Sequence, residues 1–276
     1  NLAKIGPALA AGCTVVLKPA PDTPLIAAAV ARIAAEETDI PAGVLNVVSS
    51  SDHGVGAQLT TGPRVDLVSF TGSTATGKKI MVAAAETLKK VFLELGGKSA
   101  AVVLDDADLN AACFMTALNA CTHAGQGCAL TTRLVVPREK YDEAVEAAKG
   151  AMAAFAPGDP TDPGTLCGPL ISGLQRERVE GYIALAVEEG GTIEIGGGRP
   201  SGADKAAGYW VEPTLISGLD NSARVAQEEI FGPVLVVIPH DGDDDAVRIA
   251  NDSPYGLSGA VWGSDLDRVE KVVAGI

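Results

Sequence analysis

Aromatic residues and long apolar runs are scarce in this sequence. Aromatic side chains make up 4% of the 276 residues, although hydrophobic residues as a class make up 47% and glycine occurs 32 times. This balance is typical of an α/β protein packed by aliphatic side chains, and it excludes a disordered chain. No apolar run approaches the roughly 20 residues that a membrane-spanning helix needs, so we expect no membrane partner.

Positive charge is also in short supply. The 21 basic residues are outnumbered by 35 acidic ones, which gives a formal net charge of -14. Nucleic acids and anionic membrane surfaces require an electropositive face, so neither is expected as a partner. The five cysteines form no CxxC pair, and their odd number argues against a disulfide framework in a chain of this length. We therefore expect a cytoplasmic protein.

Short β-branched runs alternate with longer amphipathic stretches along the whole sequence. This alternation predicts βαβ units around a mainly parallel sheet, and thus an α/β fold. Strands are expected at 14–17, 45–48, 65–70, 90–95, 100–104, 133–136, 192–195, 234–238 and 259–262. Helices are expected at about 23–37, with Thr23 as N-cap, and at 53–60, 73–86, 109–121, 138–155, 172–189, 244–251 and 266–273. Segments 156–160 and 196–208 are expected to be surface loops.

A glycine-containing turn at 70–77 follows one predicted strand and opens a helix. Free backbone N–H groups at such a turn suit a phosphate or pyrophosphate. The segment also matches the GxxxxGK pattern of a P-loop through Gly72, Gly77 and Lys78, but Lys79 stands where a Mg²⁺-binding Ser or Thr is required. A structural turn and, more weakly, a P-loop hydrolase are the alternatives.

Cys128 differs from the other cysteines because it lies in a glycine-flanked loop between a predicted helix and a predicted strand. A substrate can reach a thiol at such a place, although a lone cysteine is structural more often than catalytic. Cys13 and Cys113 are interpreted as small core residues. Cys121, His123 and Cys128 lack a fourth ligand, which makes a zinc site a weak alternative.

Glu94 lies near the end of an apolar predicted strand, just before two glycines. A buried carboxylate without a basic neighbour is costly and is often functional, whereas a salt-bridged glutamate at a strand end is the structural alternative. Lys18 follows another predicted strand, at the end where open α/β sheets bind ligands. No HExxH or GxSxG pattern occurs, which disfavours a hydrolase that uses histidine as its base.

Seven motifs occur in the order typical of the aldehyde dehydrogenase superfamily, and the resemblance covers essentially the whole chain. They are Leu17-Lys18-Pro19, Phe70-Thr71-Gly72-Ser73, Leu93-Glu94-Leu95-Gly96-Gly97-Lys98, Gly125-Gln126-Gly127-Cys128, Gly168-Pro169-Leu170-Ile171-Ser172, Glu228-Glu229-Ile230-Phe231-Gly232-Pro233 and Asn251-Asp252-Ser253-Pro254-Tyr255-Gly256-Leu257. The resemblance implies a Rossmann-like dinucleotide-binding domain at 1–95 and an α/β catalytic domain of the aldehyde dehydrogenase type at 96–276. It also implies that both ends are truncated and that the catalytic domain is incomplete at its C-terminus.

The resemblance further implies residue roles. Cys128 would be the nucleophile and Glu94 the base that activates water for hydrolysis of a thioester intermediate. Cofactor contacts are implied for Lys18, Pro21, Gly72, Ser73, Leu95, Glu229 and Phe231. Lys18 would contact the adenosine ribose, but Pro21 stands where NAD-preferring members usually carry a ribose-binding glutamate. NAD and NADP are therefore both expected, with NAD slightly favoured.

The implied reaction is the oxidation of a small-molecule aldehyde to a carboxylic acid, and the full-length parent is expected to be a homodimer or homotetramer. The asparagine that completes the family's oxyanion hole would lie upstream of Lys4, outside this sequence. The loss of one such donor costs roughly 10² to 10³ in rate. A catalytically incomplete fragment, or a module that only binds nucleotide, is therefore the alternative function.

Overall fold

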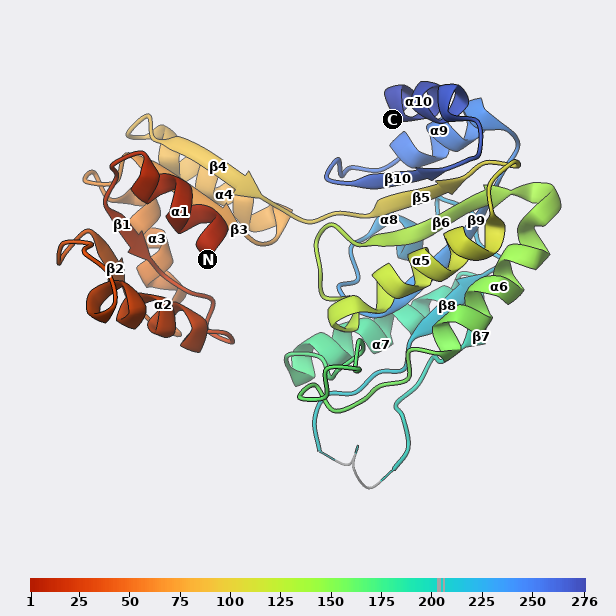
Figure 1. The fold of residues 1–276 in the computed structure, drawn as a ribbon, viewed down its shortest axis with the longest axis horizontal. Coiled ribbons are helices and arrows are strands. Elements are labelled where there is room, and N and C mark those ends of the chain that lie inside the picture. The colour runs from red at the N-terminus through yellow and green to blue at the C-terminus, as the bar shows by residue number, and fades with distance from the viewer. Residues whose placement is uncertain (203–204, 206) are drawn as a thin grey trace. The chain divides into compact units, whose positions relative to one another are not determined.

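The computed structural model describes residues 1–202, 205 and 207–276 (Figure 1). The chain divides into two compact units, Asn1–Leu95 and Gly96–Ile276. The loop expected at 196–208 includes residues 203, 204 and 206, which lie outside the described residues. In the parts of the chain that the structure describes, no helix is both long and apolar enough to cross a membrane.

The first unit consists of short helices and two separate pairs of parallel strands (Figure 1). Strand β1 pairs with β2, and β3 pairs with β4, as expected for parallel βαβ units. The elements are α1 (Leu2–Ala10), β1 (Val15–Leu17), α2 (Leu25–Glu36), β2 (Leu45–Val47), α3 (His53–Thr61), β3 (Leu67–Thr71), α4 (Thr74–Ala85) and β4 (Lys90–Glu94).

Two features of the first unit differ from the sequence prediction. Helix α1 was not predicted; it is continuous over nine residues although Pro7 lies inside it. Helix α2 begins later than predicted, with Pro24 and not Thr23 at its N-cap position. The backbone N–H of Thr23 donates to the carbonyl of Ala20 at 3.2 Å, so Thr23 belongs to the turn that precedes the helix.

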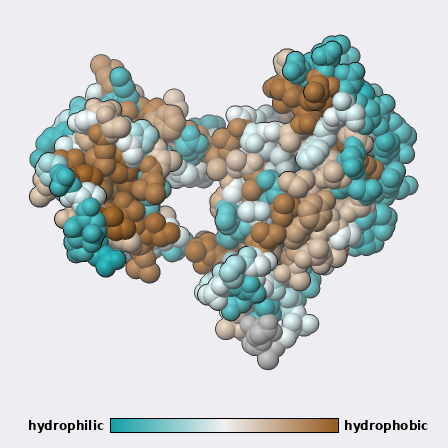
Figure 2. Space-filling model, viewed as in Figure 1, coloured by the Kyte–Doolittle hydropathy of each residue, from teal (hydrophilic) through white to brown (hydrophobic). Residues whose placement is uncertain are grey.

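Large apolar side chains reach the surface of the first unit (Figure 2). Leu88 is 92% exposed and Leu25 is 80% exposed, and both values exceed what a packed aliphatic side chain shows. Soluble monomers seldom gather such side chains on one face. The first unit of this chain therefore leaves large apolar side chains in contact with water.

The second unit is built around a six-stranded sheet in the order β10-β5-β6-β9-β8-β7. All neighbouring strands are parallel except the antiparallel edge pair β7 and β8. The strands are β5 (Ser99–Val103), β6 (Thr131–Pro137), β7 (Thr192–Ile195), β8 (Thr214–Ser217), β9 (Val234–His240) and β10 (Gly259–Trp262). The helices are α5 (Leu109–Cys121), α6 (Tyr141–Ala153), α7 (Gly173–Glu188), α8 (Arg224–Gln227), α9 (Asp243–Asn251) and α10 (Leu266–Gly275), with 3-10 turns η1 (Thr122–Gly125) and η2 (Arg138–Lys140).

The core of this unit lies on both faces of the sheet. Successive residues of a strand point to opposite faces, so Val102 packs on one side and Val103 on the other, and both are fully buried. Helices α5 and α6, which lie in front of the sheet in Figure 1, cover the face with Val103. Helices α7, α9 and α10 contribute to the other face. The predicted α/β fold is thereby confirmed, although the sequence analysis missed β8 and α8.

Strands β5, β6, β9 and β10 begin at the same edge of the sheet because they are parallel neighbours. The segments directly before them are 96–98, 128–130, 231–233 and 256–258. Four of the seven sequence motifs therefore contribute residues to this amino edge. Segments far apart in the sequence lie together there.

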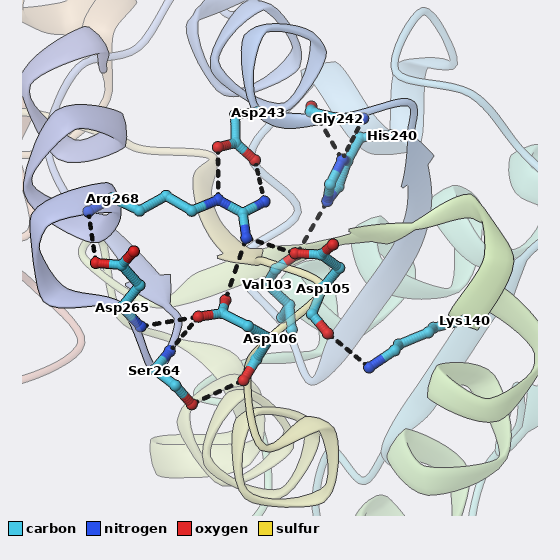
Figure 3. Close-up of polar contacts among 10 residues, drawn as sticks. All are labelled: Val103, Asp105, Asp106, Lys140, His240, Gly242, Asp243, Ser264, Asp265 and Arg268. Carbon is cyan, nitrogen blue, oxygen red and sulfur yellow. Dashed lines mark hydrogen bonds and ion pairs between the residues drawn. The ribbon is translucent and has the colours of Figure 1, made fainter.

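The opposite, carboxyl edge of the same strands is occupied by an ion-pair network (Figure 3). Arg268 of α10 forms two parallel bonds with the Asp243 carboxylate, at 2.6 and 2.7 Å, and a third with Asp105 at 2.5 Å. Asp106 accepts hydrogen bonds from two backbone N–H groups in the turn before α10. These contacts attach α9 and α10 to the sheet.

Candidate active site

Cys128 lies in a turn at the amino edge of the second unit, three residues before β6 begins. Its thiol is free and partly exposed. A Cβ atom added to Gly97 would lie 2.5 Å from the carbonyl oxygen of Cys128, so only glycine allows the LELGGK segment to approach this closely. The double glycine before β5 therefore fixes the position of the turn that contains Cys128.

The segment before Cys128 has an unusual backbone. His123, Ala124 and Gly125 are consecutive residues with φ between 53° and 70°, in the left-handed region. A Cβ atom on Gly125 would overlap the carbonyl group of Gly232, so this glycine is required for the close contact of the two loops. Such a strained run persists only where surrounding contacts fix it, and it is frequently found at functional sites.

Glu229 lies in the loop between α8 and β9 and points toward the start of β5. Its Oε1 accepts a hydrogen bond from the backbone N–H of Gly97 at 3.1 Å, and a Cβ atom on Gly96 would overlap its carboxylate. Burial raises the pKa of Glu229, while the Gly97 N–H and the positive charges of Arg178 and Lys98 lower it. The resulting site has one carboxylate held against a double glycine.

Helix α7 supports the backbone of this loop. The side-chain amide of Gln175 donates to the carbonyls of Ile230 and Phe231, at 3.1 and 2.7 Å, and the Arg178 guanidinium donates to the carbonyl of Glu229 at 2.5 Å. Phe231 has φ +63, a left-handed conformation that is strained for a bulky residue. The sequence analysis missed Gln175 and Arg178, because nothing in the local pattern of α7 distinguishes them from solvent-facing residues.

The motif at 168–172 acts through this helix. Ser172 caps α7 by accepting a hydrogen bond from the backbone N–H of Gln175 at 3.2 Å. The backbone N–H of Ile171 donates to the side chain of Gln126, beside Cys128, at 3.0 Å. The motif thus connects the cysteine loop to the helix that carries Gln175.

Glu94 is the last residue of β4 in the first unit and is half-buried. Its carbonyl accepts a hydrogen bond from Gly72 N–H at 3.0 Å, which continues the pairing of β3 and β4. The Lys4 ammonium donates to Ser69 Oγ at 2.8 Å and lies 5.6 Å from the ring centroid of Phe92. Burial lowers the pKa of Lys4, and the charge of Glu94 opposes that shift.

A basic group therefore lies near Glu94, which is a feature of the structural alternative and not of a carboxylate without a basic neighbour. Lys4 reaches the β3–β4 pair from α1, a helix that the sequence analysis did not predict. The two residues are 90 positions apart in the chain, so no local pattern could have joined them. The place of Glu94 at the end of β4 agrees with the predicted strand.

The turn at Gly72 and Ser73 begins α4 as predicted. Ser73 Oγ accepts a hydrogen bond from the Thr76 backbone N–H at 3.3 Å and so caps the helix. A Cβ atom on Gly72 would lie 2.5 Å from the ring of Phe70. The N–H groups of the first helical turn face outward from this glycine-containing turn, which is the arrangement that favours an anion.

The structure contradicts the P-loop alternative. Helix α4 begins at Thr74, so Gly77 and Lys78 lie inside the helix and not in a loop that surrounds a phosphate. A Cβ atom on Gly77 would lie 2.7 Å from the side chain of Leu95. Gly77 is small because α4 packs closely on the end of β4 at Leu95.

Lys18 and Pro21 lie beyond the carboxyl ends of the parallel strands β1 and β2. The Lys18 ammonium donates to the carbonyl of Pro19 at 2.6 Å. Pro21 lines a hollow of about 240 Å³, together with neighbouring prolines and the serines at 49–51 that follow β2. This is the end of a parallel sheet at which ligands bind in open α/β folds.

The remaining cysteines fall into two groups. Cys113, Cys121 and Cys167 are fully buried, and burial raises the pKa of each, to about 12 for Cys113 and Cys167. Cys13 is exposed, so its interpretation as a core residue was wrong. The strand that follows it, β1, has only three residues and a partly exposed face. Within the described residues, no cluster of three or more His, Cys, Asp or Glu side chains could hold a metal ion.

Comparison with known proteins gives a consistent result. The model of the aldehyde dehydrogenase family matches residues 1–276. Geranial dehydrogenase from Castellaniella defragrans is 47% identical over 267 residues, which cover 97% of this chain and 55% of that protein. A 3-succinoylsemialdehyde-pyridine dehydrogenase from a Pseudomonas species is 46% identical over 271 residues, covering 98% of this chain and 56% of that protein.

Solved structures agree with these relatives. An aldehyde dehydrogenase from Mycobacterium tuberculosis, in complex with NAD+, is 50% identical with a TM-score of 0.95, over 99% of this chain and 56% of that one. A mutant of aldehyde dehydrogenase C from Pseudomonas syringae, in complex with NAD+ and octanal, is 40% identical with a TM-score of 0.96, again over 99% and 56%. The chain spans about half the length of the proteins that it matches. By sequence and by fold, it belongs to the aldehyde dehydrogenase family.

Proposed function

We propose that this chain carries the nucleophile and the base of an NAD(P)-dependent dehydrogenase that oxidises an aldehyde to a carboxylic acid. The observation that carries the proposal is the position of Cys128. It is the partly exposed cysteine of the second unit, it lies in a turn fixed by Gly97, and it shares the amino edge of the sheet with Glu229. Cys113, Cys121 and Cys167 of the same unit are buried and out of reach of a substrate.

The chemistry follows from the properties of a thiol. Free cysteine is only a few per cent ionised near neutral pH, so Cys128 becomes an efficient nucleophile when a base removes its proton. Its sulfur adds to the aldehyde carbon and gives a thiohemiacetal. Loss of hydride from that carbon, to an acceptor that a bound nicotinamide cofactor would supply, and loss of the hydroxyl proton leave a thioester on Cys128. Water then adds to the thioester carbonyl, the C–S bond breaks, and the acid is released with the thiol restored.

Glu94 is proposed as the base that takes a proton from the attacking water. Its position at the end of β4 gives the carboxylate a fixed backbone, and the nearby Lys4 ammonium attracts it. A positioned general base contributes about 10² to 10⁴ in rate. Presence of this base favours hydrolysis of the thioester over transfer of the acyl group to a thiol such as coenzyme A.

The first unit is proposed to bind the dinucleotide and the second to carry the catalytic cysteine. A bound nicotinamide cofactor would supply the hydride acceptor. Pro21 lines the hollow beyond β1 and β2, beside Lys18 in the chain, and we propose that the adenosine ribose binds there. Gly72, Ser73 and Leu95 lie about the first turns of α4, where the pyrophosphate would lie.

Glu229 and Phe231 are proposed to face the nicotinamide end. A carboxylate can accept several hydrogen bonds, so the Glu229 group that accepts from Gly97 N–H suits the hydroxyls of a ribose. NAD+ is bound in the two related structures described above. Pro21 provides no carboxylate to repel a 2′-phosphate, so NADP+ remains a second candidate.

Reduction of NAD+ or NADP+ by simple aldehydes tests the proposal in the full-length protein that carries this chain. We expect Cys128→Ala to abolish reduced-cofactor formation and Cys13→Ala, at the exposed cysteine outside the second unit, to retain it. Glu94→Gln should keep a first burst of cofactor reduction and slow the following turnover. Equal activity of Cys128→Ala and the wild type would contradict the proposal, and cofactor binding without turnover would favour a nucleotide-binding module.

The aldehyde itself is proposed only as a class. The relatives carry names that refer to geranial and to a pyridine semialdehyde, and one related structure contains octanal. We further propose a cytoplasmic homodimer or homotetramer for the full-length protein. Light scattering during size-exclusion chromatography would measure its mass, and the mass of a monomer would contradict the proposed homodimer or homotetramer.

A further inference from the structure

Lys98 is a buried lysine with an unusual environment. It follows the double glycine, is 2% exposed, and is among the largest fully buried side chains of the chain. Among the residues that the structure describes, its Nζ atom has no hydrogen-bond partner. A buried ammonium without a partner is costly, and lysine is almost never fully buried unless paired.

The side chain of Lys98 lines a small cavity at the amino edge of the sheet. Gly97, Thr132, Glu229 and Phe231 line the same cavity, whose volume is about 10 Å³. That volume is sufficient for one water molecule, and a buried water typically makes about three hydrogen bonds. Lys98, Thr132 and Glu229 are the lining residues with polar side chains, which is that number of candidate partners.

The charges around Lys98 act in opposite directions. Burial and, to a smaller extent, the positive charge of Arg133 on β6 lower the pKa of Lys98 to about 7, although the charges of Glu229 and Glu228 act to raise it. Burial raises the pKa of Glu229, and the positive charges of Arg178 on α7 and of Lys98 oppose that shift. Lys98 and Glu229 are therefore electrostatically linked, and the charge on Lys98 changes within the physiological pH range.

We propose that Lys98 is a positioning residue, which holds the Glu229 carboxylate in place through one water molecule in this cavity. The inference rests on the proposed function, in which Glu229 binds the ribose of the cofactor. Gly97 N–H fixes one oxygen of the carboxylate from the side of the backbone. The water held by Lys98 and Thr132 orients the carboxylate from within the cavity, so that the group presents the same face to a ribose.

This role predicts a pH dependence of cofactor binding. Lys98 gains its proton as the pH falls through about 7, and the charged form strengthens the link to Glu229. We therefore expect the Kd for NAD+ to be lower at about pH 6 than at about pH 9. The expected difference is roughly tenfold, which corresponds to the free energy of one charge-assisted hydrogen bond.

With rising pH, the folding stability of the second unit should increase while the affinity for NAD+ decreases. The pKa of Lys98 in the folded unit lies below the ordinary value of 10.5. Between about pH 7 and 10.5 the unfolded chain therefore binds more protons than the folded unit. As the pH rises through that window, the free energy of unfolding of the second unit should increase. Lys98→Met keeps the length of the side chain and removes the charge. It should bind NAD+ roughly tenfold more weakly at pH 6, while its Tm at that pH is equal to or above that of the wild type.

The experiment compares NAD+ affinity by calorimetry across this pH range for the full-length wild type, Lys98→Met and Lys149→Met. Lys149 lies on α6, away from the cavity, and its variant should keep the wild-type profile. If Lys98→Met shows the wild-type Kd and pH profile, the inference is overturned and the proposed function stands. If the wild type binds neither NAD+ nor NADP+, both fail. If Lys98→Met does not fold, the Kd of the wild type for NAD+ as a function of pH is the test. A Kd that stays constant from pH 6 to 9 overturns the inference, and a Kd that rises with pH supports it.

Discussion

The side-chain amide of Gln175 donates to the carbonyl oxygen of Phe231 at 2.7 Å, and Phe231 has a left-handed backbone with φ +63. The bond comes from the first turn of α7, which Ser172 caps. A non-glycine residue in this conformation costs free energy, so its surroundings must hold it there. Gln175 is thus the link between a helix start and the loop that contains Glu229.

Replacement of Gln175 tests this link. Gln175→Met keeps the size of the side chain and removes both hydrogen bonds, which we expect to lower the free energy of unfolding by about 1–2 kcal/mol. Hydrogen–deuterium exchange in segment 228–233 should become faster than in the wild type. Glu177→Ala, at an exposed position of the same helix, serves as the control. Unchanged exchange in that segment would show that other contacts hold Phe231.

Arg133 is expected to be a major source of stability in the second unit. It is 2% exposed, and its guanidinium donates to the carbonyls of Lys98, Ile249 and Ala250 and to the side chain of Asn221, at 2.8 to 2.9 Å. Removal of the donor leaves buried acceptors unpaired, each at a cost of about 1–3 kcal/mol. We predict that Arg133→Met destabilises the unit by at least about 3 kcal/mol.

Urea unfolding measured by tryptophan fluorescence would test this prediction, because both tryptophans, Trp210 and Trp262, lie in the second unit. Arg248→Met is the control, since Arg248 is exposed and pairs with Asp245 at the surface. That variant should lose less than about 1 kcal/mol. Similar losses for the two variants would mean that the Arg133 bonds contribute little.

Two glycines are predicted to respond in opposite ways to the same substitution. Gly125 has φ +70, and a Cβ atom there would overlap the carbonyl group of Gly232. Gly125→Ala should therefore destabilise the unit by more than about 2 kcal/mol or displace the cysteine loop. Gly150, inside α6, has open space around it, so Gly150→Ala should gain about 0.5–1 kcal/mol. Differential scanning calorimetry would give both values, and a neutral Gly125→Ala would contradict the loop geometry.

The network in Figure 3 predicts sensitivity to acid. The Arg268 guanidinium, through its hydrogen bonds, holds the pKa of Asp243 below its ordinary value of 3.8. A depressed carboxyl pKa contributes stability that is complete above the unfolded value and is lost as the pH falls through the folded value. The Tm of the second unit should therefore fall as the pH decreases below about 4.

Asp243→Asn removes the titrating carboxylate and tests the assignment. The variant should have a lower Tm at neutral pH and a smaller loss of Tm on acidification than the wild type. Asp244→Asn, at the exposed neighbouring position in the first turn of α9, should retain the wild-type acid response. Equal acid slopes for wild type and Asp243→Asn would assign the response to other carboxylates.

Much of the fold could be predicted because its strands are local patterns. Segment 100–104 is a run of buried aliphatic residues between polar turns, and β5 covers nearly the same residues. By contrast, β8 is a run of only four residues between loops, and it is a strand because β7 and β9 flank it in the sheet. Helix α1 was missed because Pro7 weakens the helical pattern in the local sequence, although the helix forms.

The candidate site was predicted in part. Cys128, Glu94 and Glu229 were selected from motifs, and their roles remain predictions. Lys98 was present in one of those motifs, but its burial and its missing partner depend on β6 and on the loop before β9. Gln175 had no signal at all, because its partners are backbone carbonyls more than 50 residues away.

The sequence alone determined the aliphatic α/β composition, most of the strands and helices in their order, and the motifs that place this chain in its family. Those features are local, because propensity, capping and glycine turns act within a few residues. Only the tertiary structure decided that the loops before β5, β6 and β9 meet at one edge, that Gly97 lies against Cys128, and that Lys98 and Glu229 line one cavity. Parallel pairing brings together the ends of strands that are distant in the sequence. The burial and the electrostatic environment of a residue then depend on the segments that pack against it.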